Sequence, residues 1–521
     1  YQRRVRGCGP IPARLDSVKF LTNRFKGGLA FMTAETLQKE FEVTVIKWMF
    51  TELPATFNQQ IKVVNIKDVF EYYKWFEDHV MEFDAFVMAG AVANLTPSHP
   101  LEGKFPSHNY HVGEKFNIEF EIAPRAIDLV KQKNPRCCLI GYKLYDAKTD
   151  QELIDVAKIT LKESKANVVF ANTPKEAKSR KLVLTQDGAV FECDFNQHVE
   201  IIIKAIKQQY FKTEIVQVEE SPELQAMKGL VQLFEKTFDG FGTVAVKCCG
   251  GMVTTSRGHK GDVVFVKSVD YENKIVYSTA KATLNAPFMF KLLENCDYAV
   301  HRHEVLKDAE TVDYVFPGTV DEVVLAEQML KLNQKEVNVR HHGYVKLLMF
   351  EPVDWNLYYL QFPEKYFKVP QQITDKMEQY KEKETLEIGG NTSSTAKYLL
   401  DPNIQQKNSI SYDDLATQKF DLIVLKNAIA YLTKDELLKA KNALSKNGEF
   451  IANSFAKAPI VKITDCEAAF VRGEKVMHYL KIGDQIVSHS FFNYSREFYE
   501  EMGFMVREYG KSSCLIEFKN E

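Results

Sequence analysis

The chain has 521 residues and a formal net charge of −3, with 26% charged and 45% hydrophobic residues. This composition is that of a globular protein, and the length predicts several domains. The near-neutral charge excludes bulk electrostatic binding to nucleic acid, and no apolar run reaches the roughly 18 residues of a membrane span. The nine cysteines include no CxxC pair, which is typical of reduced thiols and indicates an intracellular, cytoplasmic protein. Because the sequence opens at Tyr1, an organellar location stays open.

Strand-like and helix-like stretches alternate along the whole chain, which predicts the α/β class. Two polar stretches, 217–224 and 366–385, have the composition of joints between domains. We therefore expect three domains, at 1–216, 217–365 and 366–521.

The first predicted domain opens with a Gly/Pro-rich loop, GCGPIPARLDSVKFLTNRFKGG at 7–28, which follows strand-like residues. A loop at a strand end can present backbone N–H groups to a phosphate, although a plain surface loop has the same composition. A second stretch, 83–110, passes from a buried-strand run to Asn94 and Lys104. Since ligands gather at the carboxyl ends of strands in open α/β sheets, a lysine there can stabilise a transferring phosphoryl or nucleotidyl group.

These motifs, with AGAVAN, GKFPS, PRCCLIGYKL, ANVVFANTP and KLVLTQDGAVFE in the same order, resemble the phosphopantothenoylcysteine synthetase family over 7–213. The resemblance implies a Rossmann-like ligase domain of coenzyme A biosynthesis, which activates a carboxylate with ATP or CTP and Mg. It implies that Asn23 holds the acyl intermediate and that Lys104 stabilises charge at the phosphate. The residues it implies for nucleotide and substrate binding are Gly9, Asp16, Lys19, Gly27, Ala91, Asn94, Lys143 and Asn172.

Two of these positions depart from the family. Asn94 stands where the family often has Asp, and an amide cannot act as a carboxylate. Lys19 replaces an Arg and cannot form a bidentate fork. The departures leave open a domain that binds a ligand without turning it over.

The middle predicted domain contains CDYAVHRHEV at 296–305. On an extended strand, His301 and His303 point to the same face, and His342 lies in a second strand-like stretch. Three histidines are a frequent ligand set of catalytic zinc, although partly exposed strand histidines give the same pattern.

The segments GTVAVKCCGGMVTTSRGHKGDVVFVKSVD, CDYAVHRHE and the stretch at 317–345 resemble the class II aldolase/adducin family, an α/β/α fold. The resemblance implies that His301, His303 and His342 bind zinc, which acts as a Lewis acid on a phosphorylated carbonyl compound. The residues it implies for anion and substrate binding are Thr243, Ser256, Arg257 and Asn285. Asn285 stands where the family has its catalytic Glu, so the aldolase base is missing, and adducin-like members bind without catalysis.

The last predicted domain resembles a class I S-adenosylmethionine-dependent methyltransferase, a Rossmann-like fold, over 384–519. Its candidate cofactor turn contains Glu387, Gly389 and Gly390, but the family's Gly-x-Gly turn has become GGNTSS. We therefore expect a shortened fold that does not bind S-adenosylmethionine and serves assembly.

Three functions remain open from the sequence. The first is a multidomain metabolic enzyme with ligase-like chemistry and a zinc-binding aldolase-like domain. The second places the chemistry in the zinc domain, with the first domain only binding a ligand. The third is a non-catalytic scaffold of a larger assembly. We expect small-molecule substrates and a homo-oligomer, without nucleic acid or membrane insertion.

Overall fold

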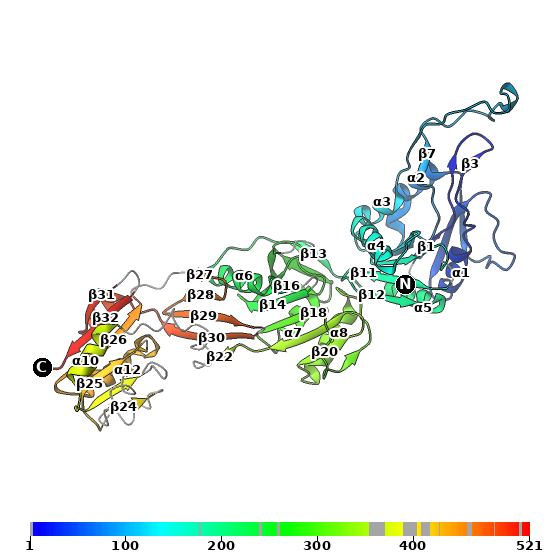
Figure 1. Cartoon of the computed structure of the whole chain (residues 1–521). Coiled ribbons are helices and arrows are strands. Elements are labelled where there is room, and N and C mark those ends of the chain that lie inside the picture. Colours follow the sequence, from blue (N-terminus) through cyan, green and yellow to red (C-terminus); the bar gives the residue numbers. More distant parts are fainter. Residues whose placement is uncertain are drawn as a thin grey trace.

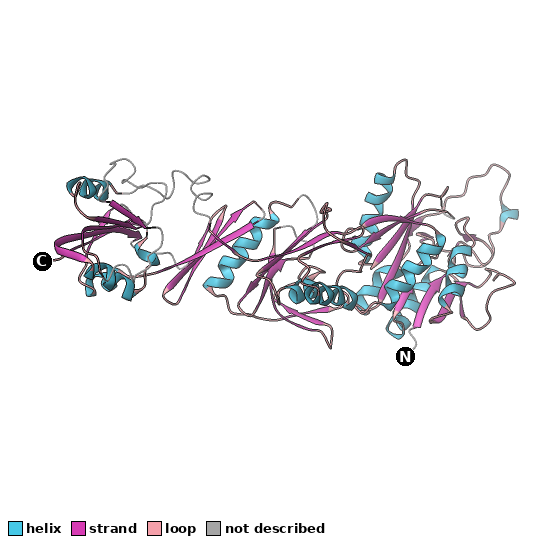
Figure 2. Cartoon of the chain, turned by 90° about the horizontal axis from the view of Figure 1, so that it is seen from below, coloured by secondary structure: helices cyan, strands magenta, loops and turns pink. Residues whose placement is uncertain are grey.

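A computed structural model describes residues 4–176, 179–238, 242–257, 261–353, 370–388, 404–407, 417–426, 428–455, 461–483, 485–509 and 513–521. Four large sheets with their helices follow one another along an elongated molecule (Figure 1). Helices lie against the strands throughout (Figure 2), so the chain is a mixed α/β, multidomain protein as expected. No helix among these residues is long and apolar enough to cross a membrane.

The first unit is built on an eight-stranded sheet. Its strands are β1 (Arg4–Cys8), β4 (Glu42–Trp48), β5 (Lys62–Ile66), β6 (Ala85–Val87), β9 (Cys138–Leu144), β10 (Val168–Asn172), β11 (Lys181–Thr185) and β12 (Val190–Cys193). They lie in the order β12-β11-β10-β9-β6-β1-β4-β5, and the six from β10 to β5 are parallel. These strands are apolar on both faces because helices cover both.

Five helices cover this sheet. One core contains side chains of α2 (Val69–His79), α3 (Ala126–Lys133) and α4 (Asp150–Ser164). The core on the other face contains α1 (Gly28–Leu37) and α5 (Phe195–Lys207). The 3₁₀ turn η1 (Val80–Glu82) follows α2.

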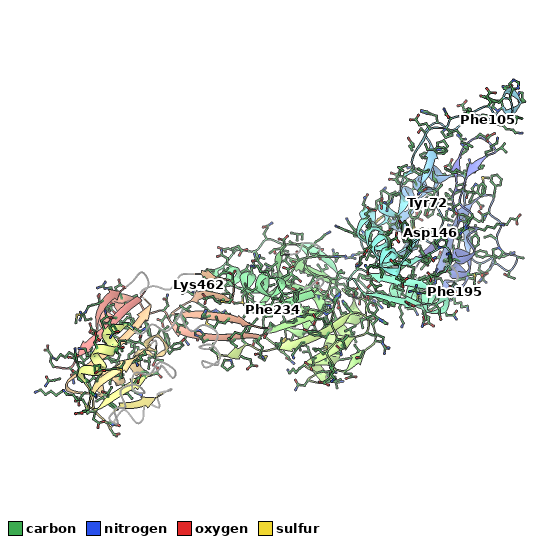
Figure 3. The ribbon with its side chains drawn as sticks, in the orientation of Figure 1. Tyr72, Phe105, Asp146, Phe195, Phe234 and Lys462 are labelled. Carbon is green, nitrogen blue, oxygen red and sulfur yellow. The ribbon has the colours of Figure 1, made fainter. Side chains whose placement is uncertain are left out.

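Two short ribbons extend from the sheet's edge. They are β2 (Ala13–Arg14) with β3 (Phe20–Leu21), and β7 (Leu95–Pro97) with β8 (Phe120–Ile122). The loop between β7 and β8 includes the 3₁₀ turn η2 (Ser107–Asn109) and reaches the end of the molecule, where Phe105 is labelled in Figure 3. There the Phe105 ring stacks on Tyr110 at 5.2 Å between centroids.

The second unit is a nine-stranded sheet in three layers with its helices. The strands are β13 (Lys212–Ile215), β14 (Gly242–Cys248), β15 (Gly251–Thr255), β16 (Val263–Asp270), β17 (Ile275–Ser278), β18 (Tyr298–Arg302), β19 (Thr311–Val312), β20 (Glu336–Val339) and β21 (Gly343–Leu348). Helices α7 (Ala286–Leu292) and α8 (Val320–Lys331) share one core with this sheet, and α6 (Pro222–Glu235) shares the other. Since β13 pairs with β17, the second sheet begins before the expected boundary at 217.

A third, five-stranded sheet covers the outer side of α6. Its strands are β22 (Glu351–Pro352), β27 (Val461–Ile463), β28 (Glu467–Arg472), β29 (Lys475–Ile482) and β30 (Gln485–Phe492). Phe470, Tyr479 and Ile486 pack in the same core as α6. The close approach depends on Gly229 of α6, where an added Cβ would lie 2.7 Å from Ile463. The expected domain at 366–521 is therefore not one continuous packing unit, because 461–492 packs on the second unit.

The remaining residues form a six-stranded mixed sheet. Its strands are β23 (Thr385–Ile388), β24 (Ile404–Lys407), β25 (Phe420–Leu425), β26 (Leu444–Phe455), β31 (Met505–Tyr509) and β32 (Ser513–Lys519). Strands β24-β23-β25-β26 are parallel, and β32 and β31 follow antiparallel. The 3₁₀ turn η4 (Ile429–Tyr431) and helices α12 (Lys434–Asn442) and α13 (Arg496–Glu501) cover one face, and α10 (Gln371–Gln379) covers the other.

Candidate functional sites

The carboxyl ends of the parallel strands in the first unit bring several of the predicted ligand-binding residues to one edge. Strand order reverses between β1 and β6, because β4 and β5 continue on one side while β9 and β10 continue on the other. Gly9 follows β1, and Ala91 follows β6 at this switch point. The Ala91 carbonyl accepts hydrogen bonds from the Ile11 N–H at 3.2 Å and from the Asn23 side-chain amide at 3.0 Å. Such a crevice is where open α/β sheets bind ligands.

The first helix begins at the same edge. Gly27 is its N-cap, with φ of 83°, and an added Cβ would lie 2.7 Å from Cδ of Pro10. Only glycine fits this left-handed position without strain. The first N–H groups of α1 therefore lie beside the Gly9 and Asn23 loops, an arrangement suited to an anion.

Asp16 organises the loop rather than facing a ligand. Its buried carboxylate accepts hydrogen bonds from the backbone N–H groups of Val18 (2.7 Å), Lys19 (2.6 Å) and Phe105 (3.0 Å), and from Nζ of Lys19 at 3.0 Å. Burial opposes ionisation, but these donors hold the pKa of Asp16 well below its usual range. Asp16 thus ties the opening loop to the segment that carries the exposed Lys104.

The other predicted residues of this domain are less closely joined. Lys143 and Asn172 lie at the ends of β9 and β10, and the Asn172 amide oxygen accepts a hydrogen bond from Lys181 at 3.4 Å. The side chain of Asn94 is exposed, and its backbone carbonyl accepts the Ala123 N–H at 3.0 Å. Within the part of the chain that the structure describes, no hydrogen bond or ion pair joins Lys104 to these side chains.

In the second unit, the structure brings the three predicted histidines together. His301 lies on β18, His303 follows this strand, and His342 precedes β21. Their ring centroids are 4.5 to 5.1 Å apart, and one ligand atom from each lies within 4.8 Å of the others. His341 has φ of 62° and stacks on Phe191 at 4.7 Å, so it turns away from the cluster.

The chemistry of the cluster fits a metal cation. Nδ1 of His301 donates to the Tyr344 carbonyl at 2.8 Å, which leaves its Nε2 as a buried lone pair without a hydrogen-bond partner. Burial lowers the pKa of His301 well below its usual value and that of His303 to about 4. Both rings are therefore neutral near pH 7, the form in which imidazole binds a metal.

A carboxylate from the first unit reaches the cluster, which the sequence did not reveal. Asp187 lies in the turn between β11 and β12, and its Oδ2 is 2.8 Å from Nε2 of His342. Tyr314 donates to the same carboxylate at 3.3 Å, and Thr185 also hydrogen-bonds to it. Burial opposes the charge, yet the neighbouring His342 holds the pKa of Asp187 well below its usual range. The only local signal was an Asp-Gly turn, which predicts a hairpin and no partner.

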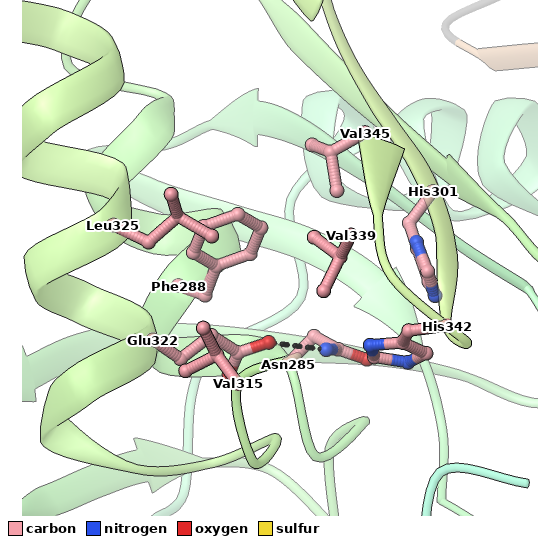
Figure 4. Close-up of a pocket in the computed structure, with 9 residues that line it drawn as sticks. All are labelled: Asn285, Phe288, His301, Val315, Glu322, Leu325, Val339, His342 and Val345. Carbon is pink, nitrogen blue, oxygen red and sulfur yellow. Dashed lines mark hydrogen bonds between the residues drawn. The ribbon is translucent and has the colours of Figure 1, made fainter. Parts of the chain in front are cut away.

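A second carboxyl group, also missed, lines the pocket beside the histidines (Figure 4). Glu322 of α8 accepts hydrogen bonds from Asn285 at 2.5 Å and from the Gly318 N–H at 2.8 Å. Burial raises the pKa of Glu322 to about 7. Asn285, predicted to replace a catalytic Glu, therefore positions another Glu. The pocket is lined by Asn285, Phe288, His301, Val315, Glu322, Leu325, Val339, His342 and Val345.

The predicted anion-binding residues lie close to this unit's sheet. Thr243 is opposite His301 in the β14–β18 register, and its hydroxyl contacts that of Thr283 at 3.0 Å. Ser256 bridges to Ala282. Arg257 is exposed and donates to the side chain of Gln186 in the first unit at 3.2 Å. Arg257 therefore contacts the same hairpin turn that carries Asp187.

The backbone at Gly343, which follows the pair His341 and His342, requires a glycine. Its φ is 127°, and an added Cβ would lie 2.7 Å from Cα of His303 and closer still to the Arg302 carbonyl oxygen. The strand carrying His301 thus approaches the start of β21 more closely than any side chain permits.

The predicted cofactor turn of the last unit is described only in part, because Gly389 and Gly390 lie outside the described residues. Glu387 is on β23, fully buried, with Oε1 2.6 Å from Nζ of the equally buried Lys426. Burial lowers the pKa of Lys426, and the Glu387 carboxylate opposes that shift. The carboxylate expected to face a cofactor is instead paired inside the protein.

Comparison with known proteins adds a family for the first unit. The model of the DNA/pantothenate metabolism flavoprotein C-terminal domain matches residues 3–214. Residues 3–214 form a domain of this family. The coenzyme A biosynthesis bifunctional protein CoaBC of Thermococcus kodakarensis is 27% identical over 169 residues, which are 32% of this chain and 40% of that protein. This chain thus aligns with less than half the length of that relative.

Solved structures of three proteins are also similar to parts of the chain. The DNA/pantothenate metabolism flavoprotein from Streptococcus pneumoniae is 20% identical with a TM-score of 0.35, covering 40% of this chain and 99% of that one. The C-terminal domain of a CoaBC protein is 21% identical with a TM-score of 0.31, covering 39% and 93%. A putative S-adenosylmethionine dependent methyltransferase from Listeria monocytogenes is 10% identical with a TM-score of 0.23, covering 29% and 97%.

Proposed function

We propose that residues 3–214 join phosphopantothenate to cysteine in a nucleotide-dependent ligase reaction. In this reaction the carboxylate attacks the α-phosphate of CTP or ATP and pyrophosphate leaves. The amine of cysteine then attacks the acyl carbon, and the nucleoside monophosphate leaves. The observation that carries the proposal is the family match over 3–214, whose relative is a coenzyme A biosynthesis protein.

The residues at the sheet edge suit these steps. The N–H groups at the start of α1, next to Gly27, offer hydrogen bonds to a phosphate. We assign the contact with the acyl group to the amide of Asn23, which hydrogen-bonds to the Ala91 carbonyl. Lys104 supplies a positive charge for the oxygens of the transferring group, and Asp16 fixes the loop on which it lies.

Replacing Lys104 with alanine is expected to lower kcat for phosphopantothenate, cysteine and CTP or ATP by about 100-fold, the usual loss for one charge-stabilising donor. Pyrophosphate release measures the rate. Lys115 is the matched control, because it is another exposed lysine of the β7–β8 loop, and Lys115→Ala should keep the rate within about twofold. Equal activity of both variants, or no nucleotide binding by the unaltered protein, contradicts the proposal.

A second candidate function belongs to the histidine cluster. His301, His303 and His342 are proposed to hold zinc, which supplies a Lewis acid for a phosphorylated carbonyl compound. Glu322 then removes the proton next to the carbonyl, because it shares the pocket with His301 and His342. The buried carboxyl beside Asn285 is the observation that favours this chemistry.

The probe for this function is solvent deuterium exchange into dihydroxyacetone phosphate, followed by NMR. Glu322→Gln is expected to slow the exchange at least about 100-fold while zinc content is unchanged, because an amide cannot accept the proton. Exposed Glu327 on the same helix gives the control Glu327→Gln. Exchange that survives in Glu322→Gln rules out the assigned base. If the unaltered protein shows neither the ligase activity nor the deuterium exchange, the scaffold function is favoured.

A further inference from the structure

Four side chains form a continuous hydrogen-bonded chain between the β27–β30 sheet and the last unit. Oε2 of Glu467 is 2.8 Å from Nε2 of His478, whose Nδ1 is 2.7 Å from Nε2 of His489. Nδ1 of His489 is 3.0 Å from the hydroxyl of Tyr431. Every nitrogen of both rings is thus used within this chain, and none of it overlaps the two sites described above.

The register of the strands produces this alignment. His478 of β29 is directly opposite His489 of β30, so their side chains share one face of the sheet. Ala469 of β28 is opposite His478, and Glu467, two residues earlier, lies on the same face as the diagonal neighbour. The alternate face, with Phe470, packs on α6. Sequence alternation therefore builds the chain of polar groups on the face away from α6.

The donor and the acceptor of each hydrogen bond in this chain can be assigned, starting from Glu467. Burial opposes ionisation of Glu467, yet donation from His478 and from Lys462 lowers its pKa to about 2, so it is an acceptor near pH 7. Nε2 of His478 must then donate, which leaves its Nδ1 to accept from Nε2 of His489. Burial lowers the pKa of His489 to about 3, so this ring is neutral, and its Nδ1 accepts from the Tyr431 hydroxyl.

The chain runs from the interior to the surface. Glu467 is fully buried and His478 is buried, whereas Tyr431 is 40% exposed. Lys462, which pairs with Glu467, lies on β27 and is labelled in Figure 3. Tyr431 ends η4, which follows β25 at the carboxyl edge of its parallel strands, the edge at which α/β sheets bind ligands.

We propose that Tyr431, His489, His478 and Glu467 form a proton-relay catalytic site, in which Tyr431 deprotonates the hydroxyl or amine of a small molecule bound at this edge. The arrangement resembles a catalytic triad, in which a nucleophile, a base and an orienting carboxylate are hydrogen-bonded in series. Here a second imidazole stands between the base and the carboxylate. Tyr431 contacts the substrate, and Glu467 is a positioning residue.

The step conserves atoms and charge. The substrate O–H or N–H bond breaks as its proton passes to the Tyr431 oxygen, and the tyrosine's own proton passes to Nδ1 of His489. The Nε2 proton of His489 moves to Nδ1 of His478. His478 becomes an imidazolium held by the Glu467 carboxylate, and the substrate atom keeps the electron pair of the broken bond.

Acetylation of tyrosines by N-acetylimidazole tests the site in the full chain, because a phenol with an adjacent base attacks an acyl carbon faster. Peptide mass spectrometry gives a rate for each tyrosine. Tyr145 and Tyr110 are internal standards, since they are 40% and 38% exposed. Tyr431 is expected to react at least about tenfold faster than either at pH 7.

The variants Glu467→Gln and His489→Phe test whether a high acetylation rate of Tyr431 comes from the relay or only from the exposure of its side chain. Each should lower the Tyr431 rate about tenfold without changing the Tyr145 rate. Glu474→Gln, at an exposed carboxylate of the turn between β28 and β29, is the control and should change neither rate. A Tyr431 rate equal to those of Tyr110 and Tyr145, or unaffected by both relay variants, overturns the proposal.

Discussion

Replacing Lys426 with methionine is expected to destabilise the last unit by about 3–5 kcal/mol, the cost of leaving a buried partner charge unpaired. The ammonium of Lys426 lies 2.6 Å from Glu387, and both side chains are fully buried; Glu387 is on β23 and Lys426 directly follows the adjacent strand β25. Methionine fills a similar volume, so the loss comes from the uncompensated carboxylate rather than from a cavity.

Hydrogen exchange of the β23 and β25 amides measures this effect locally, since a protein of several units does not unfold in one step. Lys434→Met is the control, because Lys434 is exposed on α12. The double variant with Glu387→Leu should recover most of the loss, since both charges are then removed. Protection in Lys426→Met equal to that in Lys434→Met would show that the pair contributes little.

The same pair lies at the predicted ligand edge of the last sheet. Glu387 and Lys426 lie at the carboxyl ends of parallel strands, where a doubly wound sheet offers its ligand site. At this edge the Glu387 carboxylate is paired with the buried ammonium of Lys426. The expectation that the last unit does not use S-adenosylmethionine stays a prediction.

Replacing His342 with alanine is expected to abolish stoichiometric zinc binding, with metal content falling from about one ion per chain to near zero, because two remaining ligands do not hold zinc tightly. The protein is dialysed against zinc and then against buffer, and elemental analysis gives the number of zinc ions per chain. His341→Ala is a matched control in the adjacent residue, since His341 stacks on Phe191 and takes no part in the cluster.

Asp187→Asn adds a graded test of the same site. Since Asp187 holds His342 from outside the ligand set, its loss should weaken zinc about 10- to 100-fold without abolishing it, as chelator competition would measure. Zinc retained by His342→Ala, or lost equally in His341→Ala, would show that the ion binds elsewhere.

Sequence patterns predicted the parts of the protein that depend on local structure. The pair His301 and His303 follows from strand periodicity, and the loop from Gly9 to Gly27 from turn composition. Asp187 and Glu322 could not be predicted this way, because their partners are 155 and 37 residues away. Neither has an alternation or spacing that marks a buried carboxylate.

The placement of 461–492 escaped prediction for the same reason. These residues read as ordinary strands, and nothing local says whether they continue the surrounding sheet or cover α6. One contact on which this packing is built joins Ile463 to Gly229, a helix glycine more than 230 residues earlier, whose missing side chain leaves room for it. Sequence periodicity indicates which residues are buried, but it does not indicate which part of the chain they pack against.

The path of the chain has a mechanical consequence. The polypeptide leaves β22 for the last sheet, returns to form β27 to β30, and departs again to end in β31 and β32. Three segments of the chain therefore connect the five-stranded sheet to the six-stranded sheet. Cleavage of one peptide bond in any one of these segments leaves the two sheets attached. Rotation of one against the other must twist all three connections, which restricts the swing of the last unit and keeps Tyr431 in register with His489.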